Sequence, residues 1–313
     1  KTDRSFMRHW TGSWKTSGYL QRTGSQKKGE KMNKKVNIIV DSTADITEDV
    51  KERMTVVPLT LHFGDEEYIE GVTIQKKEFY QKLIESDVLP KTSQASPADF
   101  EDVFEKIVAA GESAVVITLS SKLSGTWQSA MIAAREYEDS VYVVDSRSVA
   151  IGTAILAKLA LRLADEGMEA REIAERLEKE REKICLIAML DTLEYLKKGG
   201  RISAAAAFAG GVLSIKPVVC IRDGEIVILG KARGSKQGNN LLVSEIRKTG
   251  GIDFTKPILL GYTGLDDTLL QKYIEDSKAL WEEGISSLET TMIGSVIGTH
   301  AGPGAVAVAF FSV

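Results

Sequence analysis

The chain has 313 residues, 43% of them apolar and 27% charged, so it has enough apolar material for one large core or two medium ones. Its 40 lysines and arginines nearly balance 44 acidic residues, giving a net charge of -4, which argues against a protein that mainly coats nucleic acid. No apolar run reaches the roughly 18 to 20 residues that cross a bilayer, and no secretory signal follows the basic N-terminus. We therefore expect a cytoplasmic protein.

Cysteines and histidines are too few for a metal centre or a disulfide framework. The chain contains only Cys185 and Cys220, and its histidines are His9, His62 and His300. Zinc would need carboxylate ligands collected from scattered positions. We therefore predict neither a metal site nor a cofactor.

Residues 1–32 are polar and rich in Lys, Gly, Ser and Thr, without a clear period. Apolar periodicity begins at Met32, so we interpret 1–32 as an N-terminal extension outside the fold. A loosely held tail is the simpler interpretation, and docking of its Trp10, Trp14 and Tyr19 on a partner is the alternative.

Residues 33–155 alternate short Val- and Ile-rich runs with helical patterns. Such runs are typical of strands buried on both faces. The predicted strands cover 36–40, 56–63, 114–119 and 141–144, and the predicted helices cover 76–85, 97–110 and 124–137. This βαβ series predicts an α/β domain with a mostly parallel sheet and helices on both faces.

A long helical pattern over 149–167 leads out of this unit, and we place a domain boundary near residue 155. Residues 156–313 predict a second α/β domain of α+β type with a mixed sheet, in which Asp223-Gly224 forms a hairpin turn. The predicted strands cover 184–190, 217–221, 225–230, 257–263 and 305–312, with helices over 236–248 and 266–283.

Hydroxyl-bearing and acidic residues follow several predicted strands of the first domain. Ligands bind at the carboxyl ends of strands in open parallel sheets. Hydroxyls and helix-start amides there suit a carboxylate or phosphate, although each segment also precedes a helix and can act as its cap. The segments are 41–45, 58–60, 91–96, 118–126 and 145–146.

Two enzyme classes remain as alternatives to a binding protein. The sequence has neither the glycine fingerprint of a dinucleotide fold nor a nucleotide phosphate loop. Ser124 lies at a strand-to-helix turn outside a Gly-x-Ser-x-Gly elbow, and a hydrolase would pair it with His300. A phosphate-ligand enzyme would use Asp41 and Asp45.

Glycines accompany two further candidate residues. His300 lies in the glycine-rich segment 293–304, where an imidazole could donate to an anion or, with a raised pKa, pair with it. Arg201 follows Gly199-Gly200, from which it could hold an anion or a partner's acidic group, or bond to nearby carbonyls.

Six motifs, in this order along the chain, resemble the DegV family. They are Val-Asp-Ser-Thr-Ala-Asp at 40–45, Val-Pro-Leu at 57–59, Lys-Thr-Ser-Gln-Ala-Ser-Pro at 91–97, Leu-Ser-Ser-Lys-Leu-Ser-Gly-Thr at 119–126, Leu-Lys-Lys-Gly-Gly-Arg-Ile at 196–202 and Thr-His-Ala-Gly-Pro-Gly at 299–304. Each motif alone is weak, but the ordered set is specific. The extension 1–32 departs from the family pattern.

The resemblance implies a lipid-binding protein that holds one long-chain fatty acid, such as palmitate, with its carboxylate at the domain junction. The matching carboxylate-binding residues are Thr60, Ser93 and His300, with the Ser124-Gly125-Thr126 turn close by. It further implies a bacterial fatty acid kinase subunit that performs no chemistry alone and offers the carboxylate to an ATP-binding partner for acyl phosphate formation. Arg201 would dock that partner or the product. Any contact with a membrane would be transient.

Overall fold

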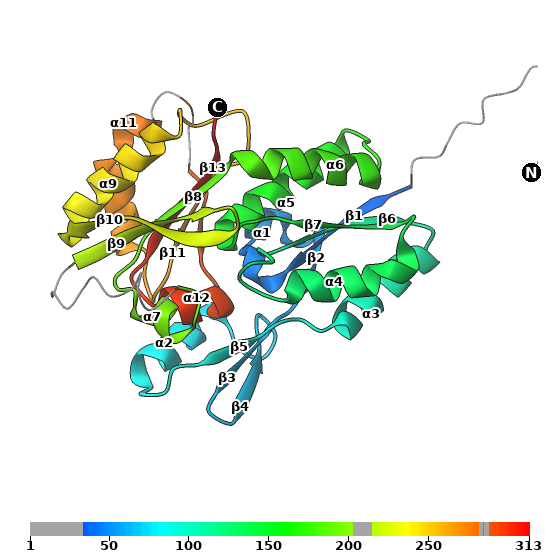
Figure 1. Cartoon of the computed structure of the whole chain (residues 1–313), viewed down its shortest axis with the longest axis horizontal. Coiled ribbons are helices and arrows are strands. Elements are labelled where there is room, and N and C mark those ends of the chain that lie inside the picture. Colours follow the sequence, from blue (N-terminus) through cyan, green and yellow to red (C-terminus); the bar gives the residue numbers. More distant parts are fainter. Residues whose placement is uncertain (1–33, 203–214, 282–283, 285–287) are drawn as a thin grey trace, which may run out of the picture. The chain divides into compact units, whose positions relative to one another are not determined.

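The computed structural model describes residues 34–202, 215–281, 284 and 288–313 (Figure 1). The predicted extension 1–32 lies outside these residues. Residues 33–313 group into one compact unit by their contacts, and the boundary near residue 155 stays a prediction. Among the helices that the structure describes, none has the length and apolarity to cross a bilayer.

The first sheet is wholly parallel and has the strand order β2-β1-β6-β7. Alternate residues of its buried strands point to opposite faces. Ile39 and Val116 pack with helices α3 and α4, whereas Ile38 and Val115 pack with α5 and α6. The predicted parallel sheet with helices on both faces is therefore confirmed. Its strands are β1 Val36–Asp41, β2 Met54–Val57, β6 Ser113–Thr118 and β7 Val141–Asp145.

The second sheet is mixed, with the order β10-β9-β8-β13-β11-β12, and only β11 and β12 run parallel. The predicted hairpin joins β9 to β10 through Asp223 and Gly224, both at positive φ. One face of this sheet packs on α9 and α10, and the other contributes to the core around α5. Its strands are β8 Ile184–Met189, β9 Ile215–Arg222, β10 Glu225–Arg233, β11 Leu259–Tyr262, β12 Thr290–Met292 and β13 Val306–Phe311.

Helix α5, Ala150–Asp165, is buried along nearly its whole length because both sheets contribute to the core around it. Its one buried cation, Lys158, bonds to Asp49 and Glu289. The remaining helices are α1 Glu48–Lys51, α2 Lys76–Glu85, α3 Pro97–Ala109, α4 Thr126–Ala134, α6 Ala170–Glu180, α7 Glu194–Lys198, α9 Gly234–Lys248, α10 Thr268–Asp276, α11 Lys278–Trp281 and α12 Ser295–Ala301, with short 3-10 turns η1 Ser42–Ala44, η2 Arg135–Tyr137 and η3 Arg181–Lys183.

The single strand predicted over 56–63 is wrong. The chain breaks at Pro58, which has no N–H to donate to a ladder, so β2 ends at Val57 and a new strand starts at Thr60. The new strand belongs to a third, antiparallel sheet of order β4-β3-β5. Its strands are β3 Thr60–Phe63, β4 Glu66–Ile69 and β5 Lys91–Ser93.

Candidate functional site

A cavity of about 390 Å³ lies where the two larger sheets, the start of α5 and helix α12 come together. Most of its wall is apolar. Leu59 and Leu119 contribute from the first sheet's loops, Leu186 and Val219 from the second sheet, and Ile297 from α12. Such a wall accepts an apolar ligand and excludes water.

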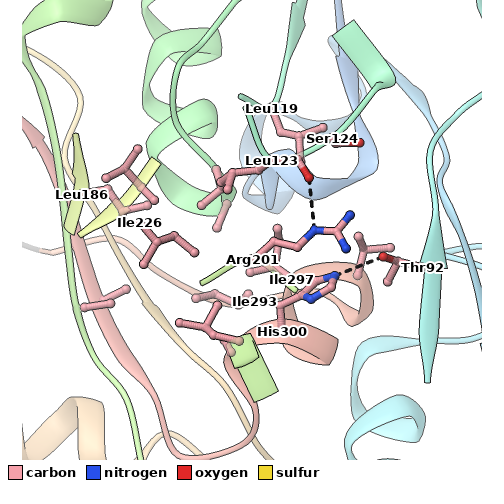
Figure 2. Close-up of a pocket in the computed structure, with 18 of the residues that line it drawn as sticks. Thr92, Leu119, Leu123, Ser124, Leu186, Arg201, Ile226, Ile293, Ile297 and His300 are labelled. Atoms are coloured by element: carbon pink, nitrogen blue, oxygen red, sulfur yellow. Dashed lines mark hydrogen bonds between the residues drawn. The ribbon is translucent and has the colours of Figure 1, made fainter. Parts of the chain in front are cut away.

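The polar groups of the cavity gather at one end. Figure 2 shows Thr92, Ser124, Arg201 and His300 at this end, while Leu186 and Ile226 lie at the opposite one. Ser93, Gln94 and Gly125 also line the cavity. The cavity therefore has one polar end and one apolar end.

Helix α12 carries His300 into the polar end. The imidazole Nε2 lies 3.1 Å from the Thr92 hydroxyl (Figure 2), and Nδ1 is buried without a hydrogen-bond partner among the residues that the structure describes. Burial, and secondarily the charge of Arg201, lower the pKa of His300 to about 4. The imidazole by itself is therefore neutral near pH 7, and pairing with an anion would require the charge of that anion to raise this pKa.

Gly199 leaves the space that the imidazole fills. A Cβ on Gly199 would lie 2.2 Å from His300 Nδ1. The φ of Gly199 is -75°, so its backbone would accept alanine and only the contact with the ring requires glycine. The corner after α7 thus fixes the imidazole from the side opposite Thr92.

Arg201 connects this corner to the turn before α4. Its Nε donates to the Leu123 carbonyl at 3.2 Å (Figure 2), and Nη1 donates to the Gly199 carbonyl at 2.7 Å. Of the roles considered from sequence, bonding to nearby carbonyls is the one observed. The guanidinium nevertheless lines the cavity and is only partly buried, so it brings positive charge to the polar end.

The Ser124 turn is stabilised by its own hydroxyls and by Gln94. Ser124 Oγ lies 3.0 Å from Thr126 Oγ1, and the Gln94 amide donates to Ser129 Oγ at 3.0 Å. A Cβ on Gly125 would lie 2.0 Å from Gln94 Oε1, so glycine at this position lets the Gln94 side chain pack against the turn. Sequence reasoning did not single out Gln94 or Thr92, although both lie in the hydroxyl-rich segment 91–96.

The structure brings most of the predicted carboxylate-binding residues together. Ser93, Ser124, Gly125 and His300 line one cavity. Thr60 and Thr126 are not among its lining residues. Thr60 pairs with Ser93 across β3 and β5, and Thr126 is buried behind Ser124.

Asp41 and Asp45 are occupied by internal donors. Asp41 accepts the N–H of Thr43 at 3.0 Å and that of Leu119 at 2.7 Å, and burial raises its pKa to about 6. Asp45 accepts Lys76 Nζ at 2.8 Å. These contacts engage the carboxylates of Asp41 and Asp45 within the fold, so they are not arranged for a phosphate ligand. The described residues hold no group of three or more His, Cys, Asp or Glu side chains suited to a metal ion.

The hydrolase alternative also lacks its central contact. In the described part of the chain, Ser124 Oγ has Thr126 as its side-chain partner, and His300 Nε2 has Thr92. No hydrogen bond joins Ser124 to His300 there, so the imidazole is not placed as a base for this hydroxyl.

The fold and site define an α/β protein with an apolar cavity that ends in a cluster of neutral donors and one arginine. Residues 35–313 match the family described as "Uncharacterised protein, DegV family", and the chain belongs to that family. A DegV domain-containing protein of Caldanaerobacter subterraneus is 37% identical over 259 residues, covering 82% of this chain and 90% of the relative.

Solved structures agree with this assignment. A DegV family protein from Thermus thermophilus, described for its fatty acid binding, has a TM-score of 0.80 and 30% identity, covering 89% of this chain and 100% of the other. A stearic acid-binding protein from Eubacterium ventriosum has a TM-score of 0.79 and 27% identity, covering 88% and 98%.

We expect His300 to stay neutral at all pH values above about 5, because its pKa is lowered to about 4. Since the unfolded chain has the ordinary value of 6.5, this histidine contributes stability that is present above pH 6.5 and lost as the pH falls through 4. Titration of the ring Cε1–H by NMR, assigned with His300→Gln, measures the midpoint. A midpoint above 6 would contradict the described environment.

Proposed function

We propose that this protein binds one long-chain fatty acid in the cavity, with the carboxylate at the polar end and the acyl chain toward Leu186 and Ile226. The observation that carries the proposal is the cavity itself, which has a mostly apolar wall and gathers Thr92, Ser124, Arg201 and His300 at one end. The fatty acid binding described for the Thermus thermophilus relative supports it.

Apolar burial would supply most of the affinity. About 15 methylenes at roughly 0.8 kcal/mol each give a gross gain of about 12 kcal/mol, from which ordering costs subtract much. An unpaired buried carboxylate would be unfavourable, so hydroxyl donors and one N–H of the neutral imidazole must satisfy it.

We further infer that the protein performs no chemistry alone and presents the carboxylate to an ATP-binding kinase subunit in the cytoplasm, which forms the acyl phosphate. The absence of a Ser124–His300 contact in the described residues supports a role without hydrolysis. Ser93 is exposed while it lines the polar end, which gives a partner a route to the carboxylate.

Removing donors from the polar end should weaken palmitate binding without unfolding the protein. We expect Ser93→Ala and His300→Ala each to raise the Kd by about one to two decades, the value of a hydrogen bond to a charged group. Isothermal titration calorimetry measures the Kd, and circular dichroism checks the fold. Ser244→Ala, at an exposed position of α9 outside the cavity, is the matched control. Unchanged binding in the double variant would place the carboxylate elsewhere.

Arg201→Glu tests presentation to the partner. A reversed charge at the polar end should disfavour the kinase encounter, so we expect retained lipid and at least a tenfold loss of acyl phosphate formation. Mass spectrometry measures bound lipid, and phosphorylation is followed with the cognate kinase. Because Arg201 bonds to two carbonyls, Arg201→Gln is the neutral comparison. Lost lipid in a folded protein would assign Arg201 to carboxylate binding, and wild-type phosphorylation would remove it from the docking surface.

A further inference from the structure

Two buried carboxylates hold the start of helix α12. The N–H of Gly294 donates to Asp45 Oδ1 at 2.6 Å, and the N–H of Val296 donates to Glu70 Oε1 at 2.8 Å. A Cβ on Gly294 would lie 2.5 Å from Glu70 Oε1 and 3.1 Å from Asp45 Oδ1, so glycine lets both carboxylates approach. We call Asp45 and Glu70 the carboxylate clamp.

The clamp also holds the loop that carries Leu59. Ser42 Oγ donates to Glu70 Oε2 at 2.6 Å and accepts the N–H of Leu59 at 3.0 Å. Leu59 and Val296 both line the cavity. Glu70 therefore positions two segments that line the cavity, the loop at Leu59 and helix α12, which carries His300.

A lysine accompanies the two carboxyl groups of the clamp. Lys76 Nζ bonds to Asp45 at 2.8 Å and to the Met292 carbonyl at 2.7 Å. Burial, reinforced by the neighbouring Asp45, raises the pKa of Glu70 from its ordinary 4.5 to about 7. Asp41 at the end of β1 and Tyr80 on α2 also interact with the clamp, whereas Glu48 on α1 and Tyr262 on β11 interact with Lys76.

We propose that Asp45 and Glu70 are positioning residues of the lipid site, which keep α12 closed over the acyl chain and release it more readily once Glu70 is ionised. The proposal rests on the proposed fatty acid binding. Release of α12 would hydrate Glu70 and return its affinity for protons to the ordinary value. Ionisation therefore favours the open state, and linkage predicts that lipid dissociation accelerates as the pH rises.

The test is the exchange rate of bound lipid. Protein loaded with deuterated palmitate is mixed with excess unlabelled palmitate at pH 6, 7 and 8, and native mass spectrometry follows the exchange. A shift of the Glu70 pKa from 4.5 to about 7 predicts a rise in the dissociation rate of about tenfold from pH 6 to pH 8. Because His300 lies beside the bound carboxylate, the comparison with a Glu70 variant separates the titration of Glu70 from that of the imidazole.

Glu70→Gln is the informative variant because it keeps the shape and fixes the group in a neutral form. We expect slower dissociation than wild type at pH 8, by more than tenfold, and a rise of about twofold or less between pH 6 and pH 8. Glu67→Gln makes the same change on exposed β4 and should behave as wild type. A flat wild-type profile, or faster dissociation in Glu70→Gln, would overturn the proposal.

Hydrogen exchange tests the positioning role of the clamp in protein without bound lipid. Hydrogen exchange of the Gly294 and Val296 amides, corrected for the intrinsic pH dependence, should show more frequent opening at pH 8 than at pH 6. Equal opening at both values would contradict the clamp in the wild-type protein. If wild type bound no fatty acid while the amides behaved as expected, the proposed function would fail and the positioning role would stand without its ligand.

Discussion

Hydrogen bonds from backbone amides to buried carboxylates hold the cavity together. Asp41 binds the N–H of Leu119 at the end of β6, while Asp45 and Glu70 bind the first amides of α12. The Asp41 bond joins two loops of the first sheet, and the Asp45 and Glu70 bonds connect the first and third sheets to the helix that carries His300. The lining of the cavity therefore depends on polar groups that never face its interior.

Burying these groups makes stability depend on pH in opposing ways. The pKa values of Asp41 and Glu70 are raised to about 6 and 7, so their contributions are largest at low pH and are lost as the pH rises through those values. The lowered pKa of His300 acts in the opposite direction below pH 6.5. The two acidic groups therefore make the stability of the fold decrease as the pH rises, while the imidazole stays neutral at the polar end.

The sequence predicted the larger sheets better than the details of the site. Helix α2 covers the predicted residues 76–85, because its buried residues Phe79, Tyr80 and Leu83 recur at helical spacing. Residues 293–304 were interpreted as a glycine-rich segment, yet Ser295–Ala301 is helical because Asp45 and Glu70 bind its first amides. Glu70 belongs to no recognisable motif, and its role depends on contacts 226 residues away in the chain. Local patterns could not reveal it.

Extraction of the purified protein tests most directly whether the cavity holds a fatty acid. Organic extracts of protein made in several hosts should contain about one acyl chain of about 14 to 18 carbons per protein by mass spectrometry, since an apolar cavity favours an apolar occupant. Extracts without a stoichiometric fatty acid, together with no saturable binding of added palmitate, would contradict the account.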